Sequence, residues 1–225
     1  MLMDILVIAA HPDDEVLGCG GVIWLHRQAG HQVHVLILTD GAGGRYDAEQ
    51  TADLQKASQA CAQYLGVASL HNAGLPNQKL DALSLGQVIA AIEDRVDRCK
   101  PSRVFTHHPG DLNLDHSIAY RATLTALRPL PGAFTRELYT YFVPSSSEWN
   151  QHQPHEAFLP NVFVDIGEAL EHKIKALQFY QSEMNDFPHP RSPEAIRAHA
   201  AHFGLQVGLP HAEPFCLVRR IGGLP

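Results

Sequence analysis

One short segment near the start of the chain restricts the possible folds more than any other. A continuous apolar run, 4–10 (DILVIAA), ends directly in the polar cluster HPDDE at 11–15. An apolar run of this length without polar alternation is typical of a strand that is buried on both faces of a parallel sheet. The stretch 16–29 reads as a helix closed by Gly30, so we expect a strand, a polar turn and a helix in that order.

The alternation of strand-like and helix-like segments along the chain predicts the fold class. In the first half we expect strands at 33–39 and 103–107, and helices at 54–65, 85–96 and 117–127. The second half is less regular, with strands expected at 138–143, 161–166 and 215–219, helices at 167–182 and 193–202, and a linker or flap at 144–160. We therefore predict an α/β protein, a Rossmann-like layered domain with a mostly parallel sheet flanked by helices.

Length and charge limit the organisation and the partners of the chain. One compact domain can fill 225 residues, so we expect a single domain, 1–225. The 24 acidic residues outnumber the 17 basic ones, and no Lys/Arg cluster offsets the charge of -7, which argues against a nucleic-acid partner. The longest apolar run near the start is too short to span a membrane and lacks the basic flank of a secretion signal. We expect a soluble, cytoplasmic protein.

The first polar cluster concentrates ligands for a metal ion. His11, Asp13, Asp14 and Glu15 place one imidazole and three carboxylates within five positions, which is costly to fold unless a cation compensates the charge. Zinc binds both imidazole nitrogen and carboxylate oxygen readily. A simpler interpretation is that an aspartate caps the following helix and that the histidine has no role. Pro12 fixes the backbone after the strand, which favours the metal site.

The glycines that follow this cluster do not form a phosphate-binding loop. Dinucleotide sites place their glycines in the turn between strand and helix. Here Gly18, Gly20 and Gly21 come after the polar turn, inside the predicted helix. They indicate close packing of that helix against a strand.

A second polar cluster, HHPGDLNLDH at 107–116, follows another predicted strand. A third ligand from this segment would complete a His/Asp/His set with one open coordination position. Taken alone, the cluster could equally be structural, because Asp and Asn also cap helices. Both clusters follow parallel strands, whose carboxyl ends meet at one edge of the sheet, so we expect them to share a site.

These motifs resemble those of one known family. AHPDDE at 10–15, the GxGG that follows it and DH at 115–116 resemble the GlcNAc-phosphatidylinositol de-N-acetylase (PIG-L/LmbE-like) superfamily of zinc-dependent deacetylases. Supporting matches are TDG at 39–41, LGV at 65–67, VDI at 164–166, KxxAL at 173–177 and AExF at 212–215. The resemblance therefore extends over nearly the whole chain and implies the same layered fold.

The resemblance implies roles for individual residues of the two clusters. His11, Asp14 and His116 match the zinc ligands of the family, and Asp13 matches its general base. The family commonly has a histidine three residues before the last ligand, where this chain has Asn113. Asparagine cannot titrate, although it could donate a hydrogen bond to the oxyanion.

Several further candidates follow from the same site. With asparagine at 113, the proton for the leaving amine would come from protonated Asp13 or from His108. Asp115 could orient His116, or merely cap the next helix. In loops, Arg45, His189 and Arg191 are candidates for substrate binding, although an arginine in a loop can also be simply solvated.

The function that the resemblance implies is hydrolysis of an amide. A zinc-dependent enzyme would remove the acetyl group from a small-molecule N-acetylated amino sugar of the N-acetylglucosamine type, or from its conjugate. Two alternatives stay open, a zinc amidase that cleaves another C–N bond in a sugar conjugate and a non-catalytic sugar-nucleotide-binding module. The sequence also leaves open whether the protein forms a homo-oligomer.

Overall fold

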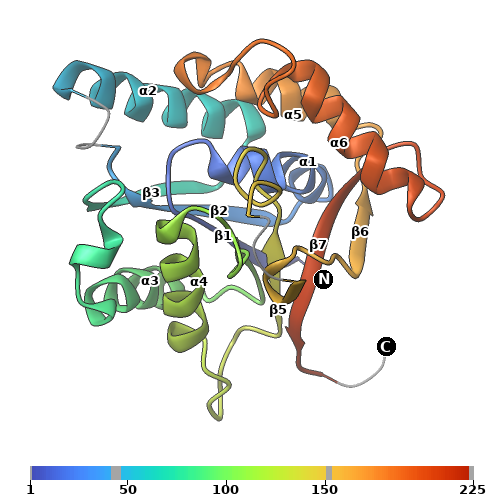
Figure 1. Ribbon diagram of the computed structural model, residues 1–225. Coiled ribbons are helices and arrows are strands. Elements are labelled where there is room, and N and C mark those ends of the chain that lie inside the picture. Colours follow the sequence, from blue (N-terminus) through green and yellow to red (C-terminus); the bar gives the residue numbers. More distant parts are fainter. Residues whose placement is uncertain (1, 42–46, 151–153, 223–225) are drawn as a thin grey trace.

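Seven strands form one sheet between two layers of helices within residues 2–41, 47–150 and 154–222, which the computed structural model describes (Figure 1). The strands are β1 (Asp4–Ala9), β2 (Gln32–Thr39), β3 (Ser69–Leu75), β4 (Arg103–His107), β5 (Glu137–Tyr141), β6 (Val162–Asp165) and β7 (Ala212–Arg220). The α-helices are α1 (Asp14–Gln28), α2 (Ala48–Leu65), α3 (Leu85–Cys99), α4 (Leu114–Ala126), α5 (Leu170–Leu177) and α6 (Pro193–Leu205). Short 3-10 helices are η1 (Leu80–Ala82), η2 (Pro154–Glu156) and η3 (Gln181–Glu183).

The order of the strands in the sheet is β3-β2-β1-β4-β5-β7-β6. The first five strands in this order pair in parallel, and β7 is antiparallel to both β5 and β6. The predicted α/β fold with a mostly parallel sheet is therefore confirmed. No helix in these described segments is both long and apolar enough to cross a membrane.

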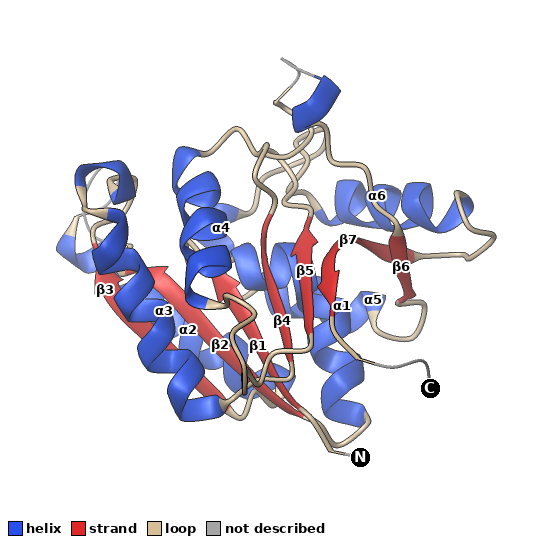
Figure 2. Cartoon of the chain, turned by 90° about the horizontal axis from the view of Figure 1, so that it is seen from below, coloured by secondary structure: helices blue, strands red, loops and turns tan. Residues whose placement is uncertain are grey.

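The two faces of the sheet carry different helices. Helices α1, α2, α5 and α6 cover one face, and α3 and α4 cover the other (Figures 1 and 2). Strands β1 and β4 are neighbours, yet the helices that follow them, α1 and α4, lie on opposite faces. The strand ends therefore open a crevice at this point, which is where parallel sheets bind their ligands.

The structure differs from the expected elements most clearly at four places. Helix α2 begins at Ala48, six residues before the expected 54, and Asp47 and Gln50 form a capping box at its start. Strand β3 was not predicted, because Asn72 and Gly74 interrupt its apolar pattern and it lies half-exposed at the edge of the sheet. Helix α4 begins at Leu114, three residues earlier than expected, because the Asn113 side chain caps it. Helix α5 covers only Leu170–Leu177 of the expected 167–182.

The glycines of α1 allow close packing, as the sequence predicted. A Cβ atom on Gly18 would overlap the ring of Tyr141 on β5. A Cβ atom on Gly21 would lie 2.6 Å from the side chain of Ile166, directly after β6. Helix α1 therefore lies so close to the sheet that its backbone contacts the side chains of Tyr141 and Ile166.

A buried ion pair contacts the backbone in the middle of the same helix. Lys173 Nζ on α5 lies 2.7 Å from Glu213 Oε1 on β7 and donates to the carbonyl oxygen of Leu17 at 2.8 Å. The carboxylate of Glu213 accepts the amides of Gly21 and Val22, each at 2.8 Å. In a regular helix the amide of Gly21 would reach the carbonyl of Leu17. The KxxAL, AExF and GxGG motifs therefore meet in one structural contact.

Candidate metal centre

Three side chains from the two polar clusters meet above the carboxyl ends of β1 and β4. His11 Nδ1 lies 3.1 Å from Asp14 Oδ2 and 3.2 Å from His116 Nε2. The Asp14 and His116 atoms are themselves 3.2 Å apart. Three ligand atoms bound at about 2.1 Å to one four-coordinate ion would be about 3.4 Å from each other. The three residues can therefore hold a metal ion with little rearrangement.

Each of the two histidines has a carboxylate at the ring nitrogen that faces away from this group. His11 Nε2 lies 3.1 Å from Asp115 Oδ2, and His116 Nδ1 lies 3.1 Å from Asp111 Oδ2. Such carboxylates fix the ring orientation and the tautomer of a metal-binding histidine. The expectation that Asp115 orients His116 is corrected, because neighbouring residues at the start of α4 point in different directions. Asp115 faces His11 instead.

The charges around the three residues favour a cation between them. Oδ1 of Asp14 is buried and, within the described residues, has no hydrogen-bond partner. Burial acts to raise the pKa of Asp14, but His116, His107 and His11 together hold this pKa well below its usual value. Burial lowers the pKa of His116, but the carboxylates of Asp14 and Asp111 outweigh it and raise this pKa to about 10. A metal ion can take the place of that proton.

Asp13 lies beside the three ligands but points elsewhere. It precedes α1 with φ 104° and makes no side-chain cap hydrogen bond, so helix capping does not explain this residue. Its Oδ2 accepts a hydrogen bond from Arg191 Nη1 at 2.6 Å. Burial raises the pKa of Asp13 well above its usual value, and the charge of Arg191 opposes this.

The left-handed conformation of Asp13 is unfavourable for a residue with a Cβ atom, and it comes with a hydrogen bond to the side chain of Glu15. The amide of Asp13 donates to Glu15 Oε2 at 3.1 Å. Tyr180, directly before η3, donates to the other oxygen of Glu15 at 2.5 Å. Asp13 and Asp14 consequently direct their carboxylates to different partners, although they are adjacent in the chain.

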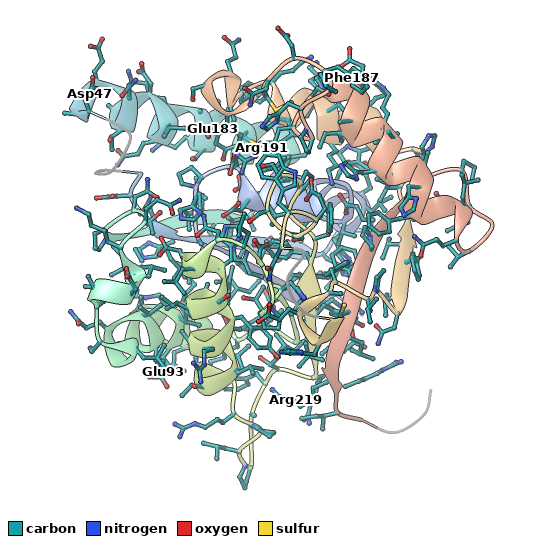
Figure 3. All side chains as sticks on the ribbon, in the orientation of Figure 1. Asp47, Glu93, Glu183, Phe187, Arg191 and Arg219 are labelled. Atoms are coloured by element: carbon teal, nitrogen blue, oxygen red, sulfur yellow. The ribbon has the colours of Figure 1, made fainter. Side chains whose placement is uncertain are left out.

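The loop between α5 and α6 brings both predicted loop residues to this centre. Figure 3 shows Glu183 and Arg191 side by side, and Arg191 Nη1 lies 3.6 Å from Glu183 Oε2. Arg191 Nε also donates to Ser145 Oγ at 2.8 Å. His189 Nδ1 accepts the amide of Arg191 at 3.1 Å, so the neutral ring carries its proton on Nε2.

A mostly polar cavity of about 540 Å³ surrounds the candidate ligands. Its lining comprises His11, Pro12, Asp13, Gly41, Leu54, Asn77, Gln78, Leu112, Asn113, Leu114, His116, Ser145, Ser146, Trp149, Ser182, Glu183, Asn185, His189 and Arg191. Asn113 Oδ1 accepts the amide of Asp115 at 3.0 Å as the cap of α4. Its Nδ2, 3.4 Å from Gln78 Oε1, remains a donor at the cavity.

One of the candidates lies elsewhere, and another cannot be placed. His108 Nε2 donates to the carbonyl oxygen of Glu156 at 2.9 Å, and burial lowers the pKa of this histidine. The structure does not bring His108 to the described lining of the cavity. Arg45 lies outside the described residues.

Four residues at the centre were missed by sequence reasoning. Asp111 stands inside the second cluster, but no role was assigned to it. Gln78, Trp149 and Glu183 lie in loops that carry no motif, so only the folded chain brings them to the cavity. The expected flap at 144–160 was the one signal that could have drawn attention to Trp149.

Comparisons of the sequence with a family model and with known proteins point to the same family. The model of the family PIG-L, GlcNAc-PI de-N-acetylase, matches residues 6–127. The uncharacterized deacetylase YaiS of Escherichia coli (strain K12) is 29% identical over 184 residues, which cover 79% of this chain and 90% of that protein. The diacetylchitobiose deacetylase of Thermococcus kodakarensis is 25% identical over 224 residues, covering 93% of this chain and 80% of the relative.

Solved structures agree on the fold. The conserved protein TT1542 from Thermus thermophilus matches with a TM-score of 0.78 and 26% identity, over 100% of this chain and 98% of that one. The hydratase GalB from Pseudomonas putida KT2440, which acts on 4-carboxy-2-hydroxymuconate, matches with a TM-score of 0.74 and 21% identity over the full length of both chains. At that identity the second likeness concerns the fold alone.

Proposed function

The chain belongs to the PIG-L family of GlcNAc-PI de-N-acetylases, and from this membership we propose that it is a zinc-dependent hydrolase that removes the acetyl group from an N-acetylated amino sugar or its conjugate. One observation carries the proposal. His11, Asp14 and His116 present three ligand atoms 3.1–3.2 Å apart, with the separate carboxylate of Asp13 beside them. Deacetylases of amino sugars among the relatives support the substrate class.

The donor set of the site suits zinc, with two imidazole nitrogens, one carboxylate oxygen and room for a fourth ligand. When bound, zinc supplies a water molecule of lowered pKa and polarises the acetyl carbonyl. His11, Asp14 and His116 hold the ion, and Asp111 and Asp115 fix the two imidazole rings.

In this proposal Asp13 acts as the general base. It takes one proton from the attacking water while the water oxygen bonds to the acetyl carbon. The C–N bond then breaks, and the same proton passes from Asp13 to the nitrogen of the leaving amine, so that acetate and a free amino sugar result. The contact between His108 and Glu156 supports this route over one through His108. Arg191, whose Nη1 lies 2.6 Å from Asp13 Oδ2, orients this carboxylate.

Two hydrogen-bond donors at the cavity are suited to the substrate. Asn113 Nδ2 can donate to the carbonyl oxygen as negative charge develops on it. His189 Nε2–H can donate to a hydroxyl group of the sugar, because Nδ1 is already used by the backbone. We also propose that residues 1–225 act as one deacetylase domain, since the cavity takes residues from 11 through 191.

Metal content and acetate release test the proposal together. Purified protein is analysed for metal, stripped with a chelator, and assayed on a panel of N-acetylated sugars before and after zinc is added. We expect activity to be lost with the metal and restored with zinc. Full activity in a verified metal-free preparation would refute the zinc-dependent reaction.

The two alternatives give different results in the same assays. A sugar-nucleotide-binding module would bind ligand without metal and release no acetate. An amidase acting on another C–N bond would release an amine from a different conjugate and leave the N-acetyl group intact.

A further inference from the structure

Three large apolar side chains stand exposed around the mouth of an otherwise polar cavity. Leu112 is 50% exposed, Leu114 is 57% exposed and Trp149 is 45% exposed, and all three line the cavity that contains the candidate metal ligands. Exposed apolar side chains of this size are removed from contact with water when an apolar group covers them, which is favourable. Their position next to the reacting centre makes part of the substrate the natural occupant.

These side chains come from two loops that are bonded to each other. The amide of Leu112, in the loop after β4, donates to the carbonyl oxygen of Ser146 in the turn after β5. Asn150 donates through its side chain to the carbonyl of Gly110. The loops therefore present Leu112 and Trp149 as one surface, with Leu114 at the start of α4 beside it.

The turn that carries Trp149 is also fixed to the metal centre. The hydroxyls of Ser146 and Ser147 both donate to Asp111, the latter at 2.9 Å, and Asp111 faces His116. The ring of Trp149 meets the ring of His189 edge-on, with centroids 5.7 Å apart. The indole is thus held at a set position relative to the reacting centre, and little ordering is needed when a ligand arrives.

The charges of the cavity indicate what kind of group would cover this surface. Arg191 is the only lysine or arginine in the described lining of the cavity, and it already contacts Asp13 and Glu183. Within the described lining, a carboxylate or phosphate on the substrate would therefore meet Asp13 and Glu183 and one cation that already contacts both. The flat indole and the two leucine side chains suit an uncharged ring that offers a face of C–H groups.

Building on the proposed deacetylase function, we propose that Trp149, Leu112 and Leu114 form a second subsite that binds an uncharged ring joined to the N-acetylated sugar. The substrate is then a neutral glycoside, such as a disaccharide, in preference to the free amino sugar or a conjugate with an acid. Trp149 is the specificity-determining residue of this subsite, and the metal centre acts on the sugar bound next to it.

Steady-state kinetics of the zinc-loaded enzyme test the subsite with three substrates. These are N-acetylglucosamine, its β1→4 disaccharide, and its glycoside with malic acid. We expect the disaccharide to have the highest kcat/KM. Trp149→Ala should lower that value about tenfold, the scale of one aromatic contact, while Trp149→Phe retains most of it; the value for the free sugar should fall by much less. An equal loss for free sugar and disaccharide, or a preference for the malate glycoside, would overturn the proposal.

Tryptophan fluorescence tests the subsite independently of deacetylation. The chain contains two tryptophans, and Trp24 stacks on His172, a residue that is not part of the described cavity lining. In a Trp24→Phe variant all tryptophan emission comes from Trp149, and we expect the disaccharide to change it saturably. The matched Trp149→Phe variant, which retains Trp24, should show no change. If the emission of Trp24→Phe stays constant at saturating disaccharide, the subsite is refuted whether or not acetate is released. If it changes without acetate release, the subsite holds and the proposed reaction fails.

Discussion

The carboxylates behind the two candidate ligand histidines should set the affinity of the metal centre. Asp115→Asn and Asp111→Asn each keep the size of the side chain but replace a charged acceptor, 3.1 Å from the far nitrogen of its histidine, with a neutral amide. Loss of such a partner weakens metal binding by about 10–100-fold, which equals about 1.4–2.7 kcal/mol. We expect the larger loss for Asp111, because its side chain is fully buried and also accepts two serine hydroxyls.

Zinc affinity, measured by competition with a chromophoric chelator, checks this prediction without any substrate. Asp4→Asn is a matched control, because Asp4 Oδ1 also lies 3.1 Å from a histidine nitrogen, that of His34, far along β1 from the metal centre. The control should leave the zinc dissociation constant unchanged. The melting temperature of each metal-free variant separates weakened binding from unfolding. Unchanged affinity in folded Asp111→Asn and Asp115→Asn would refute the assigned role of these carboxylates.

Three further perturbations test other parts of the structure. Asp13→Asn should keep zinc and lower turnover by about two to four orders of magnitude, whereas Asp14→Asn should weaken zinc binding. Metal content and acetate release are measured side by side on both variants. If the two effects are exchanged, the assigned roles are reversed. Lys173→Met leaves Glu213 buried without its cation and should lower the free energy of unfolding by about 3–5 kcal/mol. In urea denaturation, the double variant Lys173→Met/Glu213→Gln should lose less of this free energy than Lys173→Met alone. Burial lowers the pKa of His26 to about 4, so the unfolded chain binds a proton that the folded one does not, and stability falls as pH drops below about 6.5. The free energy of unfolding should therefore be lower at pH 5 than at pH 7, and His26→Gln should reduce this difference by up to about 2 kcal/mol. An unchanged difference in the variant would contradict this.

The sequence predicts elements well where burial is uniform. The apolar runs that became β1 and β2 are buried along nearly their whole length, so a continuous pattern sufficed. Strand β3 lies at the edge of the sheet with its side chains half-exposed, and such a strand needs no regular apolar pattern. The start of α4 depended on which of several polar residues would cap it, and the structure selects Asn113.

For the candidate site, the sequence predicts which residues come together but not how they pair. His11, Asp14 and His116 follow strand ends, so the geometry of a parallel sheet brings them to one edge. Which carboxylate faces which histidine depends on the rotation of α4 and on the loop before it, which are properties of tertiary packing that spacing does not encode. The contact between Asp13 and Arg191 joins residues 178 positions apart, and no local pattern could predict it.

The ion pair within helix α1 has a consequence for how the chain is made. All three candidate metal ligands belong to the first 116 residues that are synthesised. The carboxylate that accepts hydrogen bonds from the amides of Gly21 and Val22 follows only at residue 213. Until that residue emerges, Lys173 lacks the buried carboxylate that it pairs with, and the contact that joins α1, α5 and β7 cannot form. From residue 116 to residue 213, the nascent chain therefore carries all three ligands without a finished support beneath them. We expect a fragment that ends after α4 to retain the ligand residues and yet bind metal poorly, because α1 gains its contact with Glu213 only when β7 is present.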